Sequence, residues 1–176
     1  MKMDHVITMI AASILAGTLL SGCGSDDPGP TPEIAIGTSS DSPFTAEQQE
    51  VVEAGKAFYG AIYSRGTKDV EQAIEGRVTD ELAAQLAPDE RAFVEGAGLK
   101  YFGSPQLKPD AVKVDGDTAT LTGCLDGADA FLIRQDDDAP GIGSKTIGSL
   151  ELTIKLVRQD DRWLVDNPIG EQVDSC

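Results

Sequence analysis

Apolar residues recur along residues 45–176 at two different periods, and the change from one to the other divides this region in two. The first part has helical spacing, and the Thr45-Ala46-Glu47-Gln48 segment before it matches a capping box with Thr45 as the N-cap. The apolar positions that share one helical face are Val51, Ala54, Phe58 and Ile62, widened by Val52, Tyr59 and Tyr63. This pattern predicts a helix that begins after Thr45 and ends before Gly66.

Three shorter helices are predicted after the first. Thr67 is a candidate N-cap for a short helix that includes Val70, Ala73 and Ile74 and stops at Gly76. Thr79 is a candidate N-cap for a third helix, which we expect to end near Pro88 because proline disrupts a helix interior. A fourth helix is predicted over residues 89–97.

From Leu107 onward the apolar residues alternate with polar ones, which is typical of strands. The Asp115-Gly116-Asp117 segment is a hairpin-turn signal between two such runs. Further strands are predicted over residues 128–134, 146–158 and 163–165, with the second of these the longest. Helices followed by an antiparallel meander indicate an α+β domain, with N-terminal helices packed on an antiparallel sheet.

The segment before this domain has the anatomy of a secretory signal peptide, with Lys2 ahead of an apolar run over residues 6–20. The run ends on Leu20-Ser21-Gly22-Cys23, which resembles the bacterial lipoprotein signal. The resemblance implies cleavage before Cys23 and attachment of a diacylglycerol to its sulfur. The alternative is an uncleaved anchor helix, but the run is shorter than the ~20 residues that span a bilayer.

Residues 24–44 are rich in Pro, Gly, Ser and Asp, a composition that buries too little apolar surface to fold. The predicted organisation is a signal peptide over residues 1–22, a lipidated Cys23 with a flexible tether over residues 23–44, and one domain over residues 45–176. Two acyl chains anchor a protein stably. We therefore expect a cell-membrane protein that is held by its lipid on the extracytoplasmic side.

The charge balance excludes one class of partner. The chain has 14 Lys and Arg against 30 Asp and Glu, a formal net charge of −16. Nucleic-acid binding needs a basic surface, so no nucleic-acid partner is expected. A solvated acidic surface is the default interpretation, and a cationic partner stays open.

Cysteine and histidine usage narrows the chemistry. If Cys23 carries lipid, Cys124 and Cys176 remain in a compartment where disulfides persist, and we expect them to pair. The alternatives are two free thiols or a metal site. The only histidine, His5, lies in the signal peptide, so the mature chain has no imidazole for Ser-His-Asp or Cys-His catalysis or for the usual zinc sites. No metal and no cofactor are expected.

Several segments of the second half carry a family resemblance. They are residues 112–119, residues 124–126, residues 156–165 and a cysteine near the end, Cys176. Together with the order of the elements, they resemble the nuclear transport factor two-like (cystatin-like) domains of small actinobacterial lipoproteins. The resemblance implies a cone-shaped domain with a curved antiparallel sheet. It leaves the role open, because the fold hosts isomerases, cyclases, hydrolases and non-catalytic binders.

The resemblance also implies where a catalytic group would lie. Catalytic members of this fold place a carboxylate base inside the cone, some with a tyrosine donor, and Asp126 is the nearest candidate. Side chains alternate along a strand, so Asp126 faces outward if Leu121 and Leu125 face the helices. A bulge at Gly123 would be needed to turn it inward.

Tyr59 and Tyr63 lie at positions i and i+4 of the first predicted helix. They are candidates for the mouth of a pocket, where their hydroxyls would donate hydrogen bonds to a ligand. The alternative is that their rings complete the core while the hydroxyls reach solvent.

The leading hypothesis is a membrane-anchored, non-enzymatic module that binds a small apolar ligand or an envelope protein partner. One alternative is an isomerase- or cyclase-like enzyme that uses a buried carboxylate, Asp126, with Tyr59 or Tyr63. Another is a structural accessory of an envelope complex.

Overall fold

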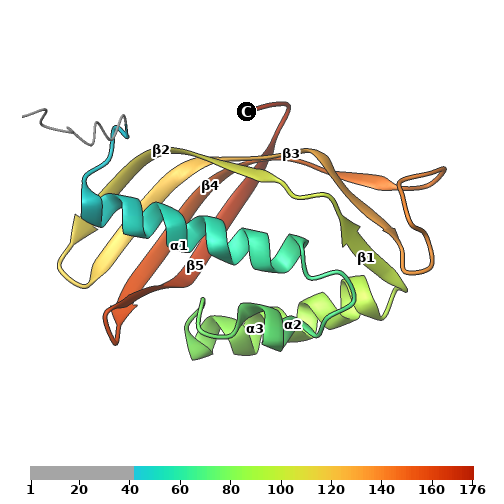
Figure 1. The fold of residues 1–176 in the computed structure, drawn as a ribbon, viewed down its shortest axis with the longest axis horizontal. Coiled ribbons are helices and arrows are strands. Elements are labelled where there is room, and N and C mark those ends of the chain that lie inside the picture. Colours follow the sequence, from blue (N-terminus) through green and yellow to red (C-terminus); the bar gives the residue numbers. More distant parts are fainter. Residues whose placement is uncertain (1–41) are drawn as a thin grey trace, which may run out of the picture. The chain divides into compact units, whose positions relative to one another are not determined.

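The computed structural model describes residues 42–176, and the predicted signal peptide, Cys23 and most of the predicted tether lie outside the described residues. Helices come first and strands follow (Figure 1). The helices are α1 (Ala46–Tyr63), α2 (Val70–Ile74), α3 (Asp80–Glu90) and the π-helix η1 (Arg91–Glu95). The strands are β1 (Leu99–Phe102), β2 (Gln106–Asp115), β3 (Thr118–Arg134), β4 (Lys145–Gln159) and β5 (Arg162–Val173).

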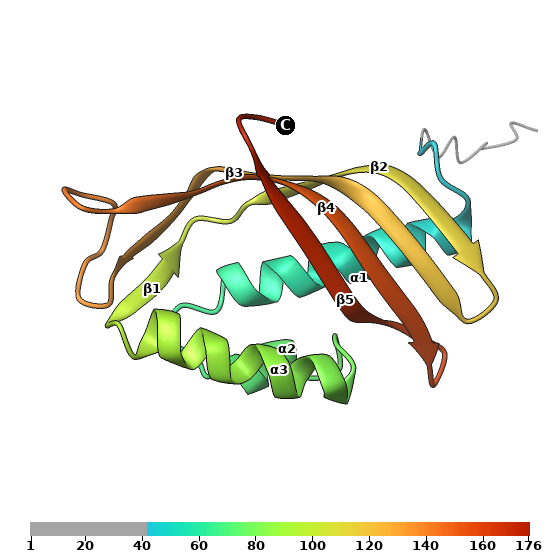
Figure 2. The same ribbon diagram turned by 180° about the vertical axis from the view of Figure 1, so that it is seen from behind.

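The strands form one antiparallel sheet, in which β3 pairs with β4 and β4 with β5. On its other side β3 pairs first with β2 and then, near its C-terminal end, with β1. The sheet is curved, and α1, α2 and α3 lie on the same side of it (Figures 1 and 2). No helix of residues 42–176 covers the other side, which we call the outer face. The predicted fold class, helices packed on a curved antiparallel sheet, is confirmed.

Helix α1 begins where the capping box predicts. The backbone N–H of Gln48 donates to Thr45 Oγ1 over 3.3 Å, and the backbone N–H of Thr45 donates to Gln48 Oε1 over 3.0 Å. The helix ends at Tyr63, before Gly66 as expected. Its buried face is the predicted apolar stripe, made of Val51, Val52, Gly55, Phe58, Tyr59 and Ile62.

The shorter helices differ from the prediction in two ways. Asp69, not Thr67, caps α2, because Asp69 directly precedes the helix and its carboxylate accepts from the backbone N–H of Glu71. The third predicted helix does not stop at Pro88, and the fourth is not separate from it. Proline removes only its own backbone donor. Beyond Pro88, the backbone N–H of Arg91 donates to the carbonyls of Ala87 and Pro88, and α3 continues directly into η1.

The sheet also departs from the prediction. Strand β1 was not predicted, since four residues are too few to display an alternating pattern. The strand predicted over residues 128–134 is the end of β3, which passes through a register shift between Gly127 and Phe131. With 17 residues β3 is longer than β4 with 15, so the longest strand was predicted wrongly.

Contacts of the domain begin before Thr45. Ser42 Oγ donates to Gln49 Oε1 over 2.8 Å, and Phe44 packs against the core. The last residues of the predicted tether therefore belong to the folded domain. Among residues 42–176, none of the helices combines the length and the apolar character that crossing a bilayer requires.

Candidate functional site

The predicted disulfide joins Cys124 on β3 to Cys176, the last residue, with 5.6 Å between their Cα atoms. Strand β4 lies between β3 and β5, and Glu151 of β4 is paired with both Cys124 and Glu171 of β5. The residues after β5 must therefore cross β4 to reach Cys124. The bridge fixes the C-terminus over the outer face and confirms the pairing expected from the cysteine count.

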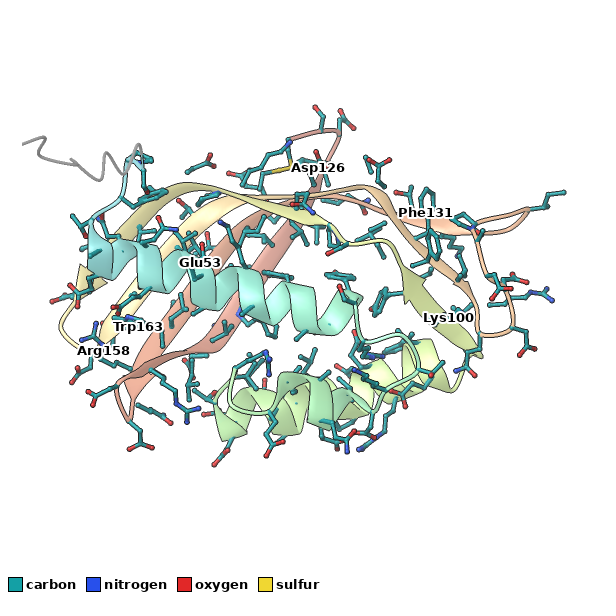
Figure 3. The ribbon with its side chains drawn as sticks, in the orientation of Figure 1. Glu53, Lys100, Asp126, Phe131, Arg158 and Trp163 are labelled. Carbon is teal, nitrogen blue, oxygen red and sulfur yellow. A yellow bond between two sulfur atoms is a disulfide. The ribbon has the colours of Figure 1, made fainter. Side chains whose placement is uncertain are left out.

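Asp126 lies on the outer face, as the alternation of β3 predicts. Leu121 and Leu125 are fully buried, whereas the side chain of Asp126 is 32% exposed. The register shift opposite this part of β3 falls in β2, between Pro109 and Ala111, and leaves the alternation of β3 intact. Figure 3 shows Asp126 beside the disulfide, away from α2 and α3.

The ionic partner of Asp126 lowers its pKa, whereas a general base needs a raised one. Lys108 Nζ donates to Asp126 Oδ2 over 2.8 Å, and the backbone N–H of Ala128 donates to Oδ1. These contacts hold the pKa of Asp126 below its ordinary value, Lys108 contributing most. A base that works near neutrality needs a raised pKa, so the enzyme alternative built on an inward Asp126 loses its base.

The space between α1 and the sheet is filled by side chains. Phe58 and Ile62 of α1 belong to one buried cluster with Leu152 and Trp163 of the sheet. Gly55 lies close to the sheet, since a Cβ atom there would lie 2.8 Å from Leu121 Cδ2 on β3. The concave side of the sheet is thus a packed core.

Both ends of this core are closed as well. At one end Arg158 lies over the ring of Trp163, 4.5 Å from its centroid, and donates to Glu47 of α1 over 2.6 Å. Figure 3 shows Arg158 and Trp163 together at this end. At the other end a cluster of tyrosines and charged groups fills the space between α1, α3 and β1.

Both candidate tyrosines, Tyr59 and Tyr63, belong to that cluster. Tyr59 is buried and stacks on Tyr63 with 6.3 Å between ring centroids, and Tyr63 meets the ring of Tyr101 edge-on at 4.7 Å. Burial raises the pKa of Tyr63 to about 12, and it also raises the pKa values of Tyr59 and Tyr101. Neither Tyr59 nor Tyr63 lines any of the five main pockets. The geometry matches the alternative in which the rings complete the core, and their role toward a ligand stays a prediction.

Arg65, which was not among the residues predicted from the sequence, holds the charged part of this cluster together. Its side chain is only 1% exposed, and its Nη1 donates to Glu90 Oε2 over 2.9 Å while Nη2 lies 3.5 Å from Glu95 Oε1. The hydroxyl of Tyr101 donates to the same Glu90, at 3.0 Å from Oε1. Among the described residues, Arg65 Nε and Glu95 Oε1 have no hydrogen-bond partner.

Glu90 resembles a catalytic carboxylate in one respect, its raised pKa. Burial raises its pKa, although Arg65 and Tyr101 act in the opposite direction. However, Arg65 and Tyr101 contact its oxygens, and it lines none of the five main pockets. The cluster joins α1, α3, η1 and β1, and the oxygens of Glu90 are used in these contacts.

The main pockets are open hollows on the surface. The first, of about 410 Å³, lies between the last turn of α1 and α2. The others lie beside α2 and α3, at the start of α1, near the C-terminal crossing, and between β1 and the β3–β4 loop. Within residues 42–176, no three His, Cys, Asp or Glu side chains are grouped so as to hold a metal ion.

Solved structures share this fold. The intermembrane space region of the chloroplast protein ARC6 is similar with a TM-score of 0.55 and 14% identity, over 74% of this chain and 100% of that one. A Nostoc punctiforme protein of unknown function with a cystatin-like fold is similar with a TM-score of 0.46 and 15% identity, over 73% and 92% of the two chains. An NTF-2-like protein of unknown function from Shewanella oneidensis has a TM-score of 0.42 and 16% identity, over 70% and 98%.

No family profile and no curated protein matches the sequence. At identities this low, similarity to solved structures shows the fold alone. The evidence for the shared fold is the similarity to the ARC6 region, whose TM-score is 0.55. The lipoprotein class and the actinobacterial origin stay predictions.

Proposed function

We propose that this protein is a membrane-anchored, extracytoplasmic lipoprotein whose domain binds an envelope protein through exposed side chains and not through its interior, without catalysis. The packed interior is the observation that carries this proposal. Gly55 lies against Leu121, and the buried clusters on either side fill the space where an apolar ligand would sit. A small apolar ligand is therefore the less favoured of the two expected partners.

Exposed apolar side chains indicate where a partner would contact the domain. Phe93 of η1, Phe102 of β1 and Ile142 of the β3–β4 loop are exposed, Phe93 to 74%. Helix η1 contacts β1, and Ile142 lines the same small pocket as Leu99 of β1. We call Phe93, Phe102 and Ile142 the β1-end residues. Exposed aromatic side chains are common contact points of protein interfaces.

Anchoring through Cys23 completes the proposal. A diacylated cysteine followed by a flexible tether would let the domain search for a partner while it stays bound to the membrane. The formal charge of −16 would keep the domain away from an anionic bilayer. Both features support a protein partner in the envelope over the lipid bilayer itself.

The anchoring step is tested by fractionating cells that make the full chain. The wild-type protein should sediment with membranes, and Cys23→Ser should prevent lipid attachment, leaving the signal peptide uncleaved. Mass spectrometry of the wild-type protein should find a diacylglycerol on Cys23. An unmodified Cys23 in the membrane fraction would contradict the lipoprotein assignment.

The partner is tested by site-specific photo-cross-linking in intact cells. A photoreactive residue at Phe93, Phe102 or Ile142 should give one dominant cross-linked protein. The matched control places the same residue at Lys113 or Lys155, which are exposed on strands β2 and β4. Equal yields at test and control positions would show random collision and contradict the proposed contact surface.

A further inference from the structure

The pocket between α1 and α2 has a composition that differs from the rest of the protein. Its floor consists of small residues, Gly60 and Ala61 of α1 and Ala73 of α2. A Cβ atom on Gly60 would meet nothing within 4 Å, so the space beside this glycine is open. The volume of about 410 Å³ lies in the range of small-molecule sites.

The rim of this pocket is polar and carries no carboxylate. It is formed by Ser64, Lys68, Gln72 and Arg77, with the buried Arg65 behind it. Lys68 and Arg77 form no ion pair among the described residues, although the chain has 30 Asp and Glu. Both cations line the same hollow, and no carboxylate lines it with them.

Neighbouring acids do not cancel these two cations. Glu71 is paired with Arg91, and Glu90 and Glu95 are paired with Arg65. Glu75 lines the pocket on the other side of α2, and its backbone carbonyl accepts from Arg77 Nη1 over 3.0 Å. More distant carboxylates are screened at physiological salt, where the Debye length is about 8 Å. The pocket therefore favours an anionic group.

The same pocket also presents acceptors. The last four carbonyls of a helix lack partners within the helix, and Ala61, which lines the pocket, belongs to the last four residues of α1. The hydroxyl of Ser64 and the amide of Gln72 add groups that accept and donate. These acceptors disfavour an anion that has no hydroxyl groups. They would accept hydrogen bonds from hydroxyl groups that lie next to the anionic group of the same ligand.

We propose that this pocket binds a small hydroxylated anion, a compound that joins a phosphate or carboxylate to neighbouring hydroxyl groups, as in a sugar phosphate or a sugar acid. The side chains of Lys68 and Arg77 bind the anionic group, and Ala61, Ser64 and Gln72 accept from the hydroxyls. This site is separate from the β1-end residues, so it stands or falls independently of the proposed protein partner.

Isothermal titration calorimetry on the full-length protein, purified in a non-ionic detergent without a sugar headgroup, tests the site. The probes are glucose 6-phosphate, glucuronate, inorganic phosphate and glucose. We expect saturable 1:1 binding of glucose 6-phosphate or glucuronate, and at least about tenfold weaker binding of glucose, which lacks the charge-assisted contacts. Inorganic phosphate should also bind more weakly because it leaves the acceptors unpaired.

Two variants assign the binding to this pocket. Lys68→Ala/Arg77→Ala should weaken it by at least about tenfold, whereas Lys113→Ala/Lys155→Ala removes the same charge from strands β2 and β4 and should leave it unchanged. Gly60→Leu places a side chain into the open space and should abolish binding while the helix keeps its fold. Equal loss in both double variants would mean diffuse attraction and would overturn the proposal.

A lipid headgroup could supply the same chemistry as a soluble compound. Glycerophosphoinositol, the soluble headgroup of phosphatidylinositol, carries a phosphate beside ring hydroxyls, and its titration in the same experiment identifies the lipid source without the acyl chains. Binding of either the free sugar compound or this headgroup, lost in Gly60→Leu, supports the site. Binding of neither overturns it.

Discussion

Gly55 of α1 lies directly against Leu121 of β3, where a single added carbon would come within 2.8 Å of the leucine Cδ2. This contact sets the distance between the long helix and the sheet. Leu121 is fully buried and cannot move aside into solvent. The absence of a side chain on Gly55 therefore allows the helix to pack closely on the sheet, which leaves the surface of the domain for contacts with a partner.

A matched pair of glycine substitutions tests this packing. Gly55→Leu should destabilise the domain by about 2–3 kcal/mol, because overpacking a core displaces its neighbours. Gly60→Leu, on the same helix but facing open space, should stabilise it by about 0.8 kcal/mol through helix propensity. Denaturant unfolding of both variants measures the difference. Equal stability of the two would mean that the interior has room for a ligand.

The disulfide should contribute a large part of the stability. It closes a loop over a sequence separation of 52 residues, for which the chain-entropy account gives about 4 kcal/mol. Cys176→Ser should therefore lower the midpoint of thermal unfolding under non-reducing conditions. The wild-type protein treated with a reductant is the control and should approach the same midpoint, while an unchanged midpoint would indicate that the bridge does not form in the cell.

Arg65 and its acidic partners should be energetically coupled. Arg65→Met leaves Glu90 and Glu95 without their cation, and breaking a buried pair from one side costs about 3 kcal/mol or more. In the Arg65→Met/Glu90→Gln double variant the loss should be smaller than the sum of the single losses by at least about 1 kcal/mol. Additive losses, measured by denaturant unfolding, would mean that the ion pair does not hold these elements together.

Asp126 should titrate as an exposed, ion-paired carboxylate. Its pKa is lowered, chiefly by Lys108, so its contribution to stability is present above the unfolded pKa, about 3.9, and is lost as the pH falls through the folded value. Nuclear magnetic resonance of the side-chain carboxyl should give a pKa below the ordinary range, and Lys108→Ala should raise it. A pKa above the ordinary range would restore Asp126 as a candidate base.

Local signals in the sequence predicted much of this architecture. The Thr45-Gln48 capping box positioned the start of α1, and the alternation of β3 placed Asp126 opposite Leu121 and Leu125. Both signals act within a few residues, so they do not depend on the rest of the fold. The pairing of Cys124 with Cys176 followed from elimination among three cysteines and is present in the structure.

Other features depend on contacts between distant segments. Strand β1 is defined by its pairing with the end of β3, and the helix continues past Pro88, where the N–H of Arg91 donates to the carbonyls of Ala87 and Pro88. Arg65 could not be identified as a buried residue, because its partners Glu90 and Glu95 lie on other elements. The default prediction for an arginine shortly after an amphipathic helix is a solvated side chain. The one sequence signal for burial of Arg65 is its position three residues after Ile62, the last buried residue of α1.

Native mass spectrometry of the full-length protein, released from its own membrane in mild detergent, tests the central claim most directly. The account predicts a stoichiometric complex with one protein partner, and a dissociated subunit whose mass equals the lipidated chain without any bound apolar compound. A stoichiometric apolar molecule retained by the isolated subunit would contradict it, since no such molecule fits between α1 and the sheet while Gly55 contacts Leu121.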